Sequence, residues 1–132
     1  MPTFKYAKLV RDNIADWHMQ SGHSLVTYQI TEADLLRALV GKLHEEADEV
    51  SASETRGSLI EELADIQEDL IAIAEHEGIT LGDIEAARMA KANRKGGFRK
   101  GVYIESVTMP NEGDKWVQYC RQSPNKYPEI SE

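Results

Sequence analysis

Apolar residues recur at helical spacing in two consecutive stretches in the middle of the chain. In residues 35–50 and again in residues 59–74 the apolar positions repeat every three or four residues, a period typical of amphipathic helices. Thr31 precedes the first stretch as a predicted N-cap, with Asp34 in a capping-box-like position. Gly78 is predicted to end the second helix. The break at residues 56–58 is short enough for a helical hairpin.

Weaker patterns predict one helix on each side of this hairpin. A short helix is expected over residues 9–20, where a Ser-Gly pair follows. Thr80 is predicted to cap a further helix that runs to about residue 94, before the Gly96-Gly97 pair. These elements make the chain mainly α.

The remaining segments carry less regular patterns. Residues 25–30 are either a short extended segment or a loop. Apolar and other residues alternate over residues 102–107, as in a short strand. Residues 116–122 indicate one or two helical turns. The C-terminal part is therefore expected to be an extension that contains a strand.

Length and charge limit the classes of partner. With 132 residues, the chain is long enough for one domain. The net charge is −8, the opposite sign to that of most nucleic-acid-binding proteins, so a nucleic-acid partner is not expected. A free nucleotide would also be repelled unless a metal ion or a local basic cluster intervenes.

Cysteine content and hydropathy indicate the compartment. The single cysteine, Cys120, excludes an intramolecular disulfide and suits a reducing environment. The first residues lack the apolar run of a signal peptide, and no apolar stretch approaches the ~20 residues that span a bilayer. We therefore expect a cytoplasmic protein with no membrane partner.

Acidic residues occupy unusual positions on the two hairpin helices. Glu46 follows one apolar residue by three positions and precedes another by four, and Glu62 has the same spacing to its apolar neighbours. Glu49 and Asp65 each follow three residues later, so each helix offers two carboxylates on adjacent turns. The alternative interpretation is that both acidic runs lie on solvated faces, as charged runs usually do.

If four carboxylates point toward a shared core, their negative charge must be removed or balanced. Burying an unpaired carboxylate is strongly unfavourable, so either the pKa values rise or a cation lies between the side chains. In an antiparallel hairpin the two pairs lie at similar distances from the connection. Ligands that are all oxygen favour Mg²⁺, with Mn²⁺ as an alternative. Magnesium commonly binds substrate phosphates as well.

Basic residues form two clusters against this acidic background. They are Lys8 with Arg11, and Lys91, Arg94, Lys95, Arg99 and Lys100 around the Gly-Gly-Phe sequence at residues 96–98. The second cluster is also explained as a helix C-terminus, where positive charge and glycine are common. Beside a metal site, such cations can hold phosphate oxygens that the metal does not neutralise.

Other catalytic signatures are missing from the sequence. There is no G-x-S-x-G nucleophile elbow and no P-loop, so triad chemistry and Walker-type nucleotide binding have no support. His44 is more simply explained as a surface or structural residue than as a ligand. His18, His23 and His76 show no metal-binding spacing.

The acidic residues also match a family motif. The sequence E-E-A-D-E at residues 45–49, followed by E-L-A-D at residues 62–65, resembles the E-E-x-x-E … E-x-x-D signature of the MazG-like all-α nucleoside triphosphate pyrophosphohydrolases. This superfamily includes phosphoribosyl-ATP pyrophosphohydrolase and dimeric dUTPases. K-L-V-R-D at residues 8–12 and the basic run into G-G-F resemble the phosphoribosyl-ATP pyrophosphohydrolase-like subgroup. The resemblance covers about residues 8–98.

This resemblance implies a MazG-like helical bundle in a single domain over residues 1–132, with a core at about 8–98 and an extension at 99–132. It implies that Glu46, Glu49, Glu62 and Asp65 bind magnesium. Glu45 and Glu46 are the implied catalytic residues, with Glu45 orienting a metal ligand or positioning water. The implied phosphate-binding residues are Lys8, Arg11, Lys91, Arg94 and Lys95, with Arg94 and Lys95 as alternatives for one contact.

The implied activity is hydrolysis of a nucleoside triphosphate, non-canonical or surplus, to the monophosphate and pyrophosphate in a house-cleaning role. The family forms homodimers or homotetramers, which a chain this short would also favour because it needs a partner to bury its apolar stripes. Two alternatives stay open: true phosphoribosyl-ATP hydrolysis in histidine biosynthesis, and a non-catalytic acidic helical module that binds a basic partner. A calcium-binding role has less support, because no loop resembles an EF-hand.

Overall fold

The structure, a computed structural model, describes residues 1–130 and contains five helices and no strand within that range. The helices are α1 (Ile14–Gln20), α2 (Glu32–Ala52), α3 (Arg56–Glu77), α4 (Leu81–Lys95) and α5 (Lys115–Arg121). The mainly α prediction is confirmed. The chain divides into two compact units, Met1–Arg94 and Lys95–Glu132, and each is described by itself below.

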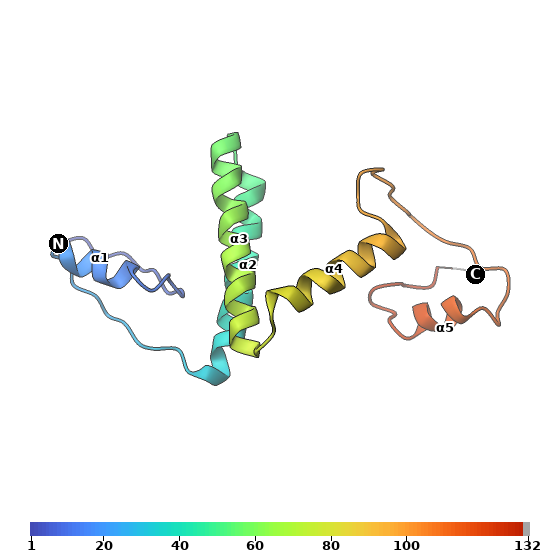
Figure 1. The fold of residues 1–132 in the computed structure, drawn as a ribbon, viewed down its shortest axis with the longest axis horizontal. Coiled ribbons are helices and arrows are strands. Elements are labelled where there is room, and N and C mark those ends of the chain that lie inside the picture. Colours follow the sequence, from blue (N-terminus) through green and yellow to red (C-terminus); the bar gives the residue numbers. More distant parts are fainter. Residues whose placement is uncertain (131–132) are drawn as a thin grey trace. The chain divides into compact units, whose positions relative to one another are not determined.

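The helices α2 and α3 lie side by side as a hairpin (Figure 1). A three-residue connection joins them, and Thr55 caps α3 by accepting a hydrogen bond from the backbone N–H of Ser58 at 3.0 Å. Because of this cap, α3 begins at Arg56, inside the segment predicted as a break. Gly78 ends α3 in the left-handed conformation with φ of 67°, as predicted, since glycine adopts it without strain.

The start of α2 agrees with its predicted position but not with its predicted cap. Thr31 has the extended backbone of an N-cap, yet its hydroxyl donates to the Asp34 carboxylate at 3.2 Å instead of accepting a helix N–H. At α4 the predicted cap does form. There the Thr80 hydroxyl accepts a hydrogen bond from the N–H of Asp83 at 3.0 Å.

Helix α1 begins five residues later than predicted, at Ile14. The preceding Asp12 and Asn13 are residue types that favour turns and helix starts over helix interiors. The N–H of Ile14 bonds to the carbonyl of Arg11 at 3.1 Å, which closes this turn. Residues 1–13 therefore form an irregular N-terminal segment.

In the second unit the predicted strand at residues 102–107 is wrong, because the structure has no strand within residues 1–130. A strand must pair its backbone groups with a neighbouring strand, and residues 95–130 supply no such pairing. The helical turns expected near residues 116–122 are present as α5. Its N-cap is Asp114, which accepts a hydrogen bond from the N–H of Trp116 at 2.9 Å.

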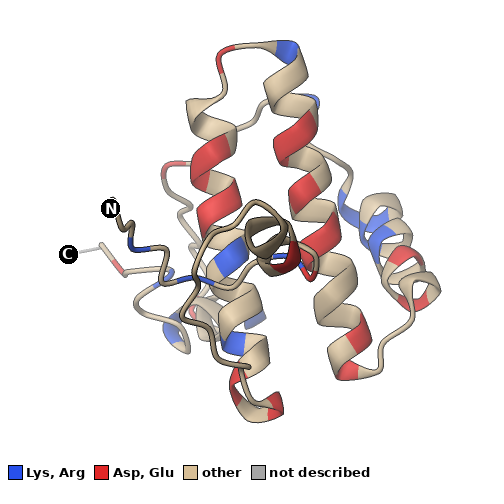
Figure 2. Ribbon diagram, turned by 90° about the vertical axis from the view of Figure 1, so that its left-hand side faces the viewer, with Lys and Arg blue, Asp and Glu red and all other residues tan. Residues whose placement is uncertain are grey.

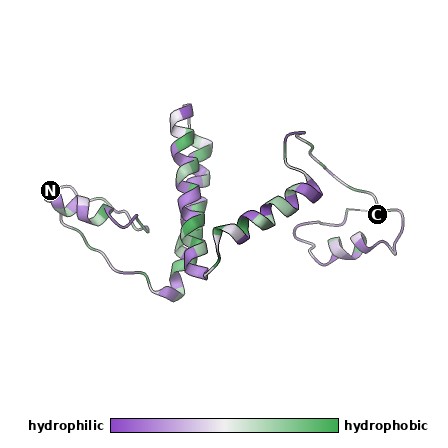
Figure 3. Ribbon diagram, viewed as in Figure 1, coloured by the Kyte–Doolittle hydropathy of each residue, from purple (hydrophilic) through white to green (hydrophobic). Residues whose placement is uncertain are grey.

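Apolar burial within one copy of the chain is small. Among the described residues, the apolar side chains that are well buried are Leu39 and Ala74, at 7% and 2% exposure. Hydrophobic and hydrophilic positions mix along both hairpin helices (Figure 3). Six large apolar side chains of the hairpin are 37–57% exposed: Leu36, Val40, Leu59, Ile60, Leu63 and Leu70. No helix within residues 1–130 is long and apolar enough to cross a membrane.

Candidate metal centre

Three carboxylates from the two hairpin helices meet at one place. Glu46 on α2 and Glu62 and Asp65 on α3 each offer an oxygen, and these oxygens all lie within 4.8 Å of one another. Acidic residues form bands on both hairpin helices (Figure 2). The meeting follows from the antiparallel hairpin, because Glu46 and Glu62 are equally far along the chain from the connection. We call these three residues the acidic cluster.

Glu49, the fourth predicted ligand, is not part of the acidic cluster and is exposed. The direction of the helices explains this. Moving three residues along the chain from Glu46 leads toward the connection, whereas moving three residues from Glu62 to Asp65 leads away from it. Glu49 and Asp65 therefore lie on opposite sides of the level that Glu46 and Glu62 share. Even so, the charge of Glu49 helps to raise the pKa of Glu62.

The acidic cluster carries negative charge that is only partly compensated. Glu46 is buried, with 8% exposure. The hydrogen bond that Glu62 shares with Glu46, together with burial and the neighbouring negative charges, raises the pKa of Glu62 to about 6. No ion pair within residues 1–130 includes Glu62. The raised pKa shows that the carboxylates repel one another, and a cation bound between them would reduce this repulsion.

The N-terminal segment brings two of the predicted basic residues to these acids. The Lys8 ammonium lies 3.2 Å from a Glu45 oxygen, and the Arg11 guanidinium lies 2.6 Å from an Asp65 oxygen. Burial alone raises the pKa of Glu45, but hydrogen bonds from Lys8 and Lys42 outweigh it and lower that pKa below its usual value. Glu45 is therefore ionised at neutral pH beside the acidic cluster.

Two further residues, not predicted for the site, contact or flank the acidic cluster. The Lys42 ammonium lies 3.3 Å from Glu45 and 3.7 Å from Glu46. Asp69 has a buried carboxylate oxygen without a hydrogen-bond partner within residues 1–130, and burial and then the charge of Glu46 raise its pKa. Helical spacing could have predicted both, because residues four apart lie on the same helix face: Lys42 precedes Glu46 by four residues, and Asp69 follows Asp65 by four.

The second basic cluster is not joined to the carboxylates. Lys91 and Arg94 are exposed on α4, and no ion pair within residues 1–130 includes either of them. Lys95, the last residue of α4, is also exposed and begins the second unit. Phosphate binding by these three residues stays a prediction.

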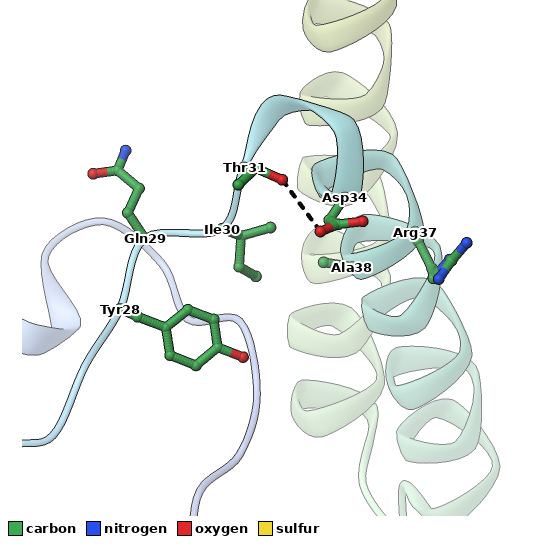
Figure 4. A pocket seen from close by; sticks show the side chains of 7 residues that line it. All are labelled: Tyr28, Gln29, Ile30, Thr31, Asp34, Arg37 and Ala38. Atoms are coloured by element: carbon green, nitrogen blue, oxygen red, sulfur yellow. Dashed lines mark hydrogen bonds between the residues drawn. The ribbon is translucent and has the colours of Figure 1, made fainter.

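A hollow of about 390 Å³ lies between the segment before α2 and the first turns of α2 (Figure 4). Tyr28, Asp34 and Arg37 are among its lining residues. None of the predicted site residues lines it. From Ala38, the last lining residue, to Glu46 is about 12 Å along α2 at ~1.5 Å per residue, so this hollow is separate from the acidic cluster.

The donor set fits a hard divalent cation. Every candidate ligand atom is a carboxylate oxygen, which suits Mg²⁺ or Mn²⁺ and disfavours softer metals. The exposed sides of Glu62 and Asp65 leave positions for water or for a ligand's oxygens. Comparison of the chain with protein-family models, curated proteins and solved structures finds no match. The function is therefore argued from this site and from the motif.

Proposed function

We propose that this protein is a magnesium-dependent hydrolase that converts a nucleoside triphosphate to the monophosphate and pyrophosphate. The observation that carries the proposal is the meeting of Glu46, Glu62 and Asp65 within 4.8 Å across a helical hairpin. The motif that these residues share with the MazG-like pyrophosphohydrolases supplies the reaction type. Non-canonical or surplus nucleotides are the proposed substrates.

The acidic cluster would hold Mg²⁺, with Mn²⁺ as an alternative and Glu49 one turn away. Bound magnesium neutralises charge on phosphate oxygens and lowers the pKa of a coordinated water. Glu46 acts as a catalytic residue by binding the ion from a buried position. Glu45 is held by Lys8 and Lys42 at 3.2 and 3.3 Å, and its lowered pKa keeps it ionised. It can therefore accept a hydrogen bond from the attacking water and orient it.

The N-terminal cations are the proposed contacts for the phosphates. Lys8 and Arg11 already lie next to the carboxylates, and their side chains are 45% and 60% exposed. Both can therefore reach a ligand without a change of fold. Guanidinium and ammonium groups bind phosphate oxygens through charge-assisted hydrogen bonds. Lys91 and Arg94, exposed and basic residues of the same unit, are proposed as further contacts. The role of Lys95, the alternative to Arg94, rests on the family resemblance alone.

A homodimer or homotetramer is the proposed assembly. The exposed apolar side chains of α2 and α3 support it, because burial of such surface against a second copy is favourable. Light scattering coupled to size-exclusion chromatography should give two or four times the chain mass of 14.8 kDa. A mass of one chain at all concentrations would contradict this part of the proposal. Cys120 is a free thiol, which suits the proposed cytoplasmic location.

The decisive assay separates pyrophosphate from orthophosphate. The protein is incubated with Mg²⁺ and a panel of NTPs, dNTPs and phosphoribosyl-ATP. We expect pyrophosphate and a monophosphate in equal amounts, and no product when EDTA replaces Mg²⁺. Orthophosphate as the first product would mean that a different bond is cut. Turnover of phosphoribosyl-ATP alone would point to histidine biosynthesis instead of house-cleaning.

A further inference from the structure

Two histidine side chains meet at the C-terminal end of α1, in the first unit. Gly22 adopts the left-handed conformation with φ of 78° and reverses the chain there. Its N–H bonds to the carbonyl of Met19, and the N–H of His23 bonds to the carbonyl of His18, both at 3.0 Å. This pair of bonds defines a Schellman motif, which brings the residue after the glycine against the last helical turn.

In most such motifs the two side chains that meet are apolar, but here both are imidazoles. The Nδ1 atoms of His18 and His23 lie 2.9 Å apart. Two tautomers or a metal ion can satisfy this contact: one ring donates its Nδ1–H to the Nδ1 of the other, or both Nδ1 atoms bind one ion. The five-residue separation is not a helical spacing, so the sequence pattern alone does not reveal the pair.

We propose that His18 and His23 form a binding site for a transition-metal ion that prefers imidazole and adopts square-planar geometry, Cu²⁺ or Ni²⁺. Metal–imidazole bonds are about 2.0–2.1 Å long. Two such ligands at a right angle are therefore about 2.9 Å apart, whereas tetrahedral ligands are about 3.3 Å apart. The observed separation of 2.9 Å is that of a hydrogen bond and is also close to the right-angle case, so little displacement of the two nitrogens is needed for a square-planar ion.

The surroundings leave room for the ion. The ring planes are tilted by 45° with centroids 5.1 Å apart, so the rings must turn to aim both lone pairs at one ion. His23 is exposed, so its ring can turn about the Cβ–Cγ bond when the ion replaces its hydrogen bond to His18. Tyr6 packs edge-on against His18 with centroids 5.6 Å apart. Beside the pair lies an open hollow of about 210 Å³ that also contacts Ser21, where water can complete the coordination.

The test is Cu²⁺ titration of the full chain without a histidine tag, with Mg²⁺ in excess to occupy the acidic cluster. Electron paramagnetic resonance should show a tetragonal Cu²⁺ signal split by two imidazole nitrogens. His18→Gln and His23→Gln should each weaken binding by at least about 10-fold, because the second imidazole acts at high effective concentration. His44→Gln, which changes an exposed histidine on α2, should leave the affinity unchanged.

A second variant tests the role of the turn. Gly22→Ala keeps both ligands but strains the left-handed backbone, so it should weaken Cu²⁺ binding by a few fold, with circular dichroism confirming that the helices remain. Equal affinity of wild type, His18→Gln and His23→Gln would overturn the proposal. A spectrum split by a single nitrogen, or equal loss with His44→Gln, would also overturn it. The acidic cluster plays no part in this outcome.

Discussion

Carboxylates are arranged in opposite ways in the hairpin and in the second unit. In the second unit Glu112 and Glu129 both lie at hydrogen-bond distance from Arg121, at 3.0 and 2.8 Å, and this pairing raises the pKa of Arg121. In the hairpin Glu46, Glu62 and Asp65 face one another, and the pKa of Glu62 rises to about 6. The same residue type is thus neutralised in one region and crowded in the other.

The contrast is between carboxylates paired with a cation of the chain and carboxylates that crowd one another, and only the second group is proposed to bind an ion. Exposed ion pairs such as those of Arg121 contribute little to stability, and their loss is tolerated. Crowded carboxylates cost stability until a cation arrives, and proteins keep such arrangements mainly where they bind ligands. Substitutions should therefore have opposite consequences in the two regions.

The largest effect is expected for Glu46→Gln. This change preserves the side-chain shape but removes the charge of a buried residue of the acidic cluster. Pyrophosphate release should fall at least about 100-fold, as expected when a metal ligand is lost. Glu68→Gln, an exposed change on the same hairpin, is the matched control and should retain activity. Equal losses in both variants would favour a surface that recognises charge alone, as in a non-catalytic acidic module.

Glu62→Gln should change stability and metal binding in opposite directions. Removing one of the crowded charges should raise the midpoint of thermal unfolding in EDTA. It should also abolish the further rise that Mg²⁺ gives to the wild-type protein. Differential scanning fluorimetry with and without Mg²⁺ measures both. A variant that is less stable than wild type in EDTA would mean that the cluster is not strained by its charges.

Mg²⁺ affinity should fall at acidic pH. The pKa of Glu62 in the folded chain is about 6, above its usual 4.5, so protons compete with the ion below about pH 6. Each further pH unit should weaken binding about 10-fold until other ligands also protonate. The stability of the metal-free protein depends on pH in the opposite direction to its Mg²⁺ affinity. The contribution of Glu62 to the free energy of unfolding is largest below pH 4.5 and is lost as pH rises through 6. Calorimetry at pH 5, 6 and 7 measures both pH dependences: Mg²⁺ affinity by titration and unfolding by scanning without metal. A Mg²⁺ affinity that does not change with pH would contradict the prediction.

Arg11→Gln should have a moderate effect that strengthens the binding of Mg²⁺ alone and weakens the binding of the triphosphate. Arg11 lies 2.6 Å from Asp65, so it competes with a metal ion for that carboxylate but can also bind phosphate. Mg²⁺ alone should bind a few fold more tightly to the variant, whereas KM for the triphosphate should increase. Lys5→Gln, in the same N-terminal segment, is the control. An unchanged KM would remove Arg11 from the substrate site.

The smallest effect is expected for Arg121→Ala in the second unit. Its ion pairs are exposed and screened by salt, so the unfolding midpoint should fall only slightly and Mg²⁺ affinity should not change. Thermal unfolding at low and high salt measures this difference. A large loss of Mg²⁺ binding would mean that the two groups of carboxylates are not independent.

The hairpin could be predicted from sequence because its signals are local. The apolar period and the stop at Gly78 each act within a few residues. The connection lies at residues 53–55, three residues before the predicted break at 56–58, because Thr55 caps α3. The start of α1 was missed because apolar residues before Asn13 mimic the period of a helix. The strand at residues 102–107 was wrong because alternation shows that a segment can pair, not that a partner exists.

The candidate site could be predicted in part for the same reason. The spacing of Glu46, Glu62 and Asp65 was sufficient once an antiparallel hairpin was assumed. Glu49 was placed with them because sequence counting ignored that the two helices run in opposite directions. The contact of Arg11 with Asp65 spans 54 residues of chain, and no local pattern encodes such a pairing.

The most direct measurement is Mn²⁺ binding, followed by loss of the free-ion paramagnetic resonance signal, to wild type, Glu46→Gln, Glu62→Gln and Glu68→Gln. We expect saturable binding to wild type and Glu68→Gln, and a large loss in the other two variants. Equal binding to all four proteins, or none to wild type at millimolar Mn²⁺, would contradict a divalent-cation site between α2 and α3.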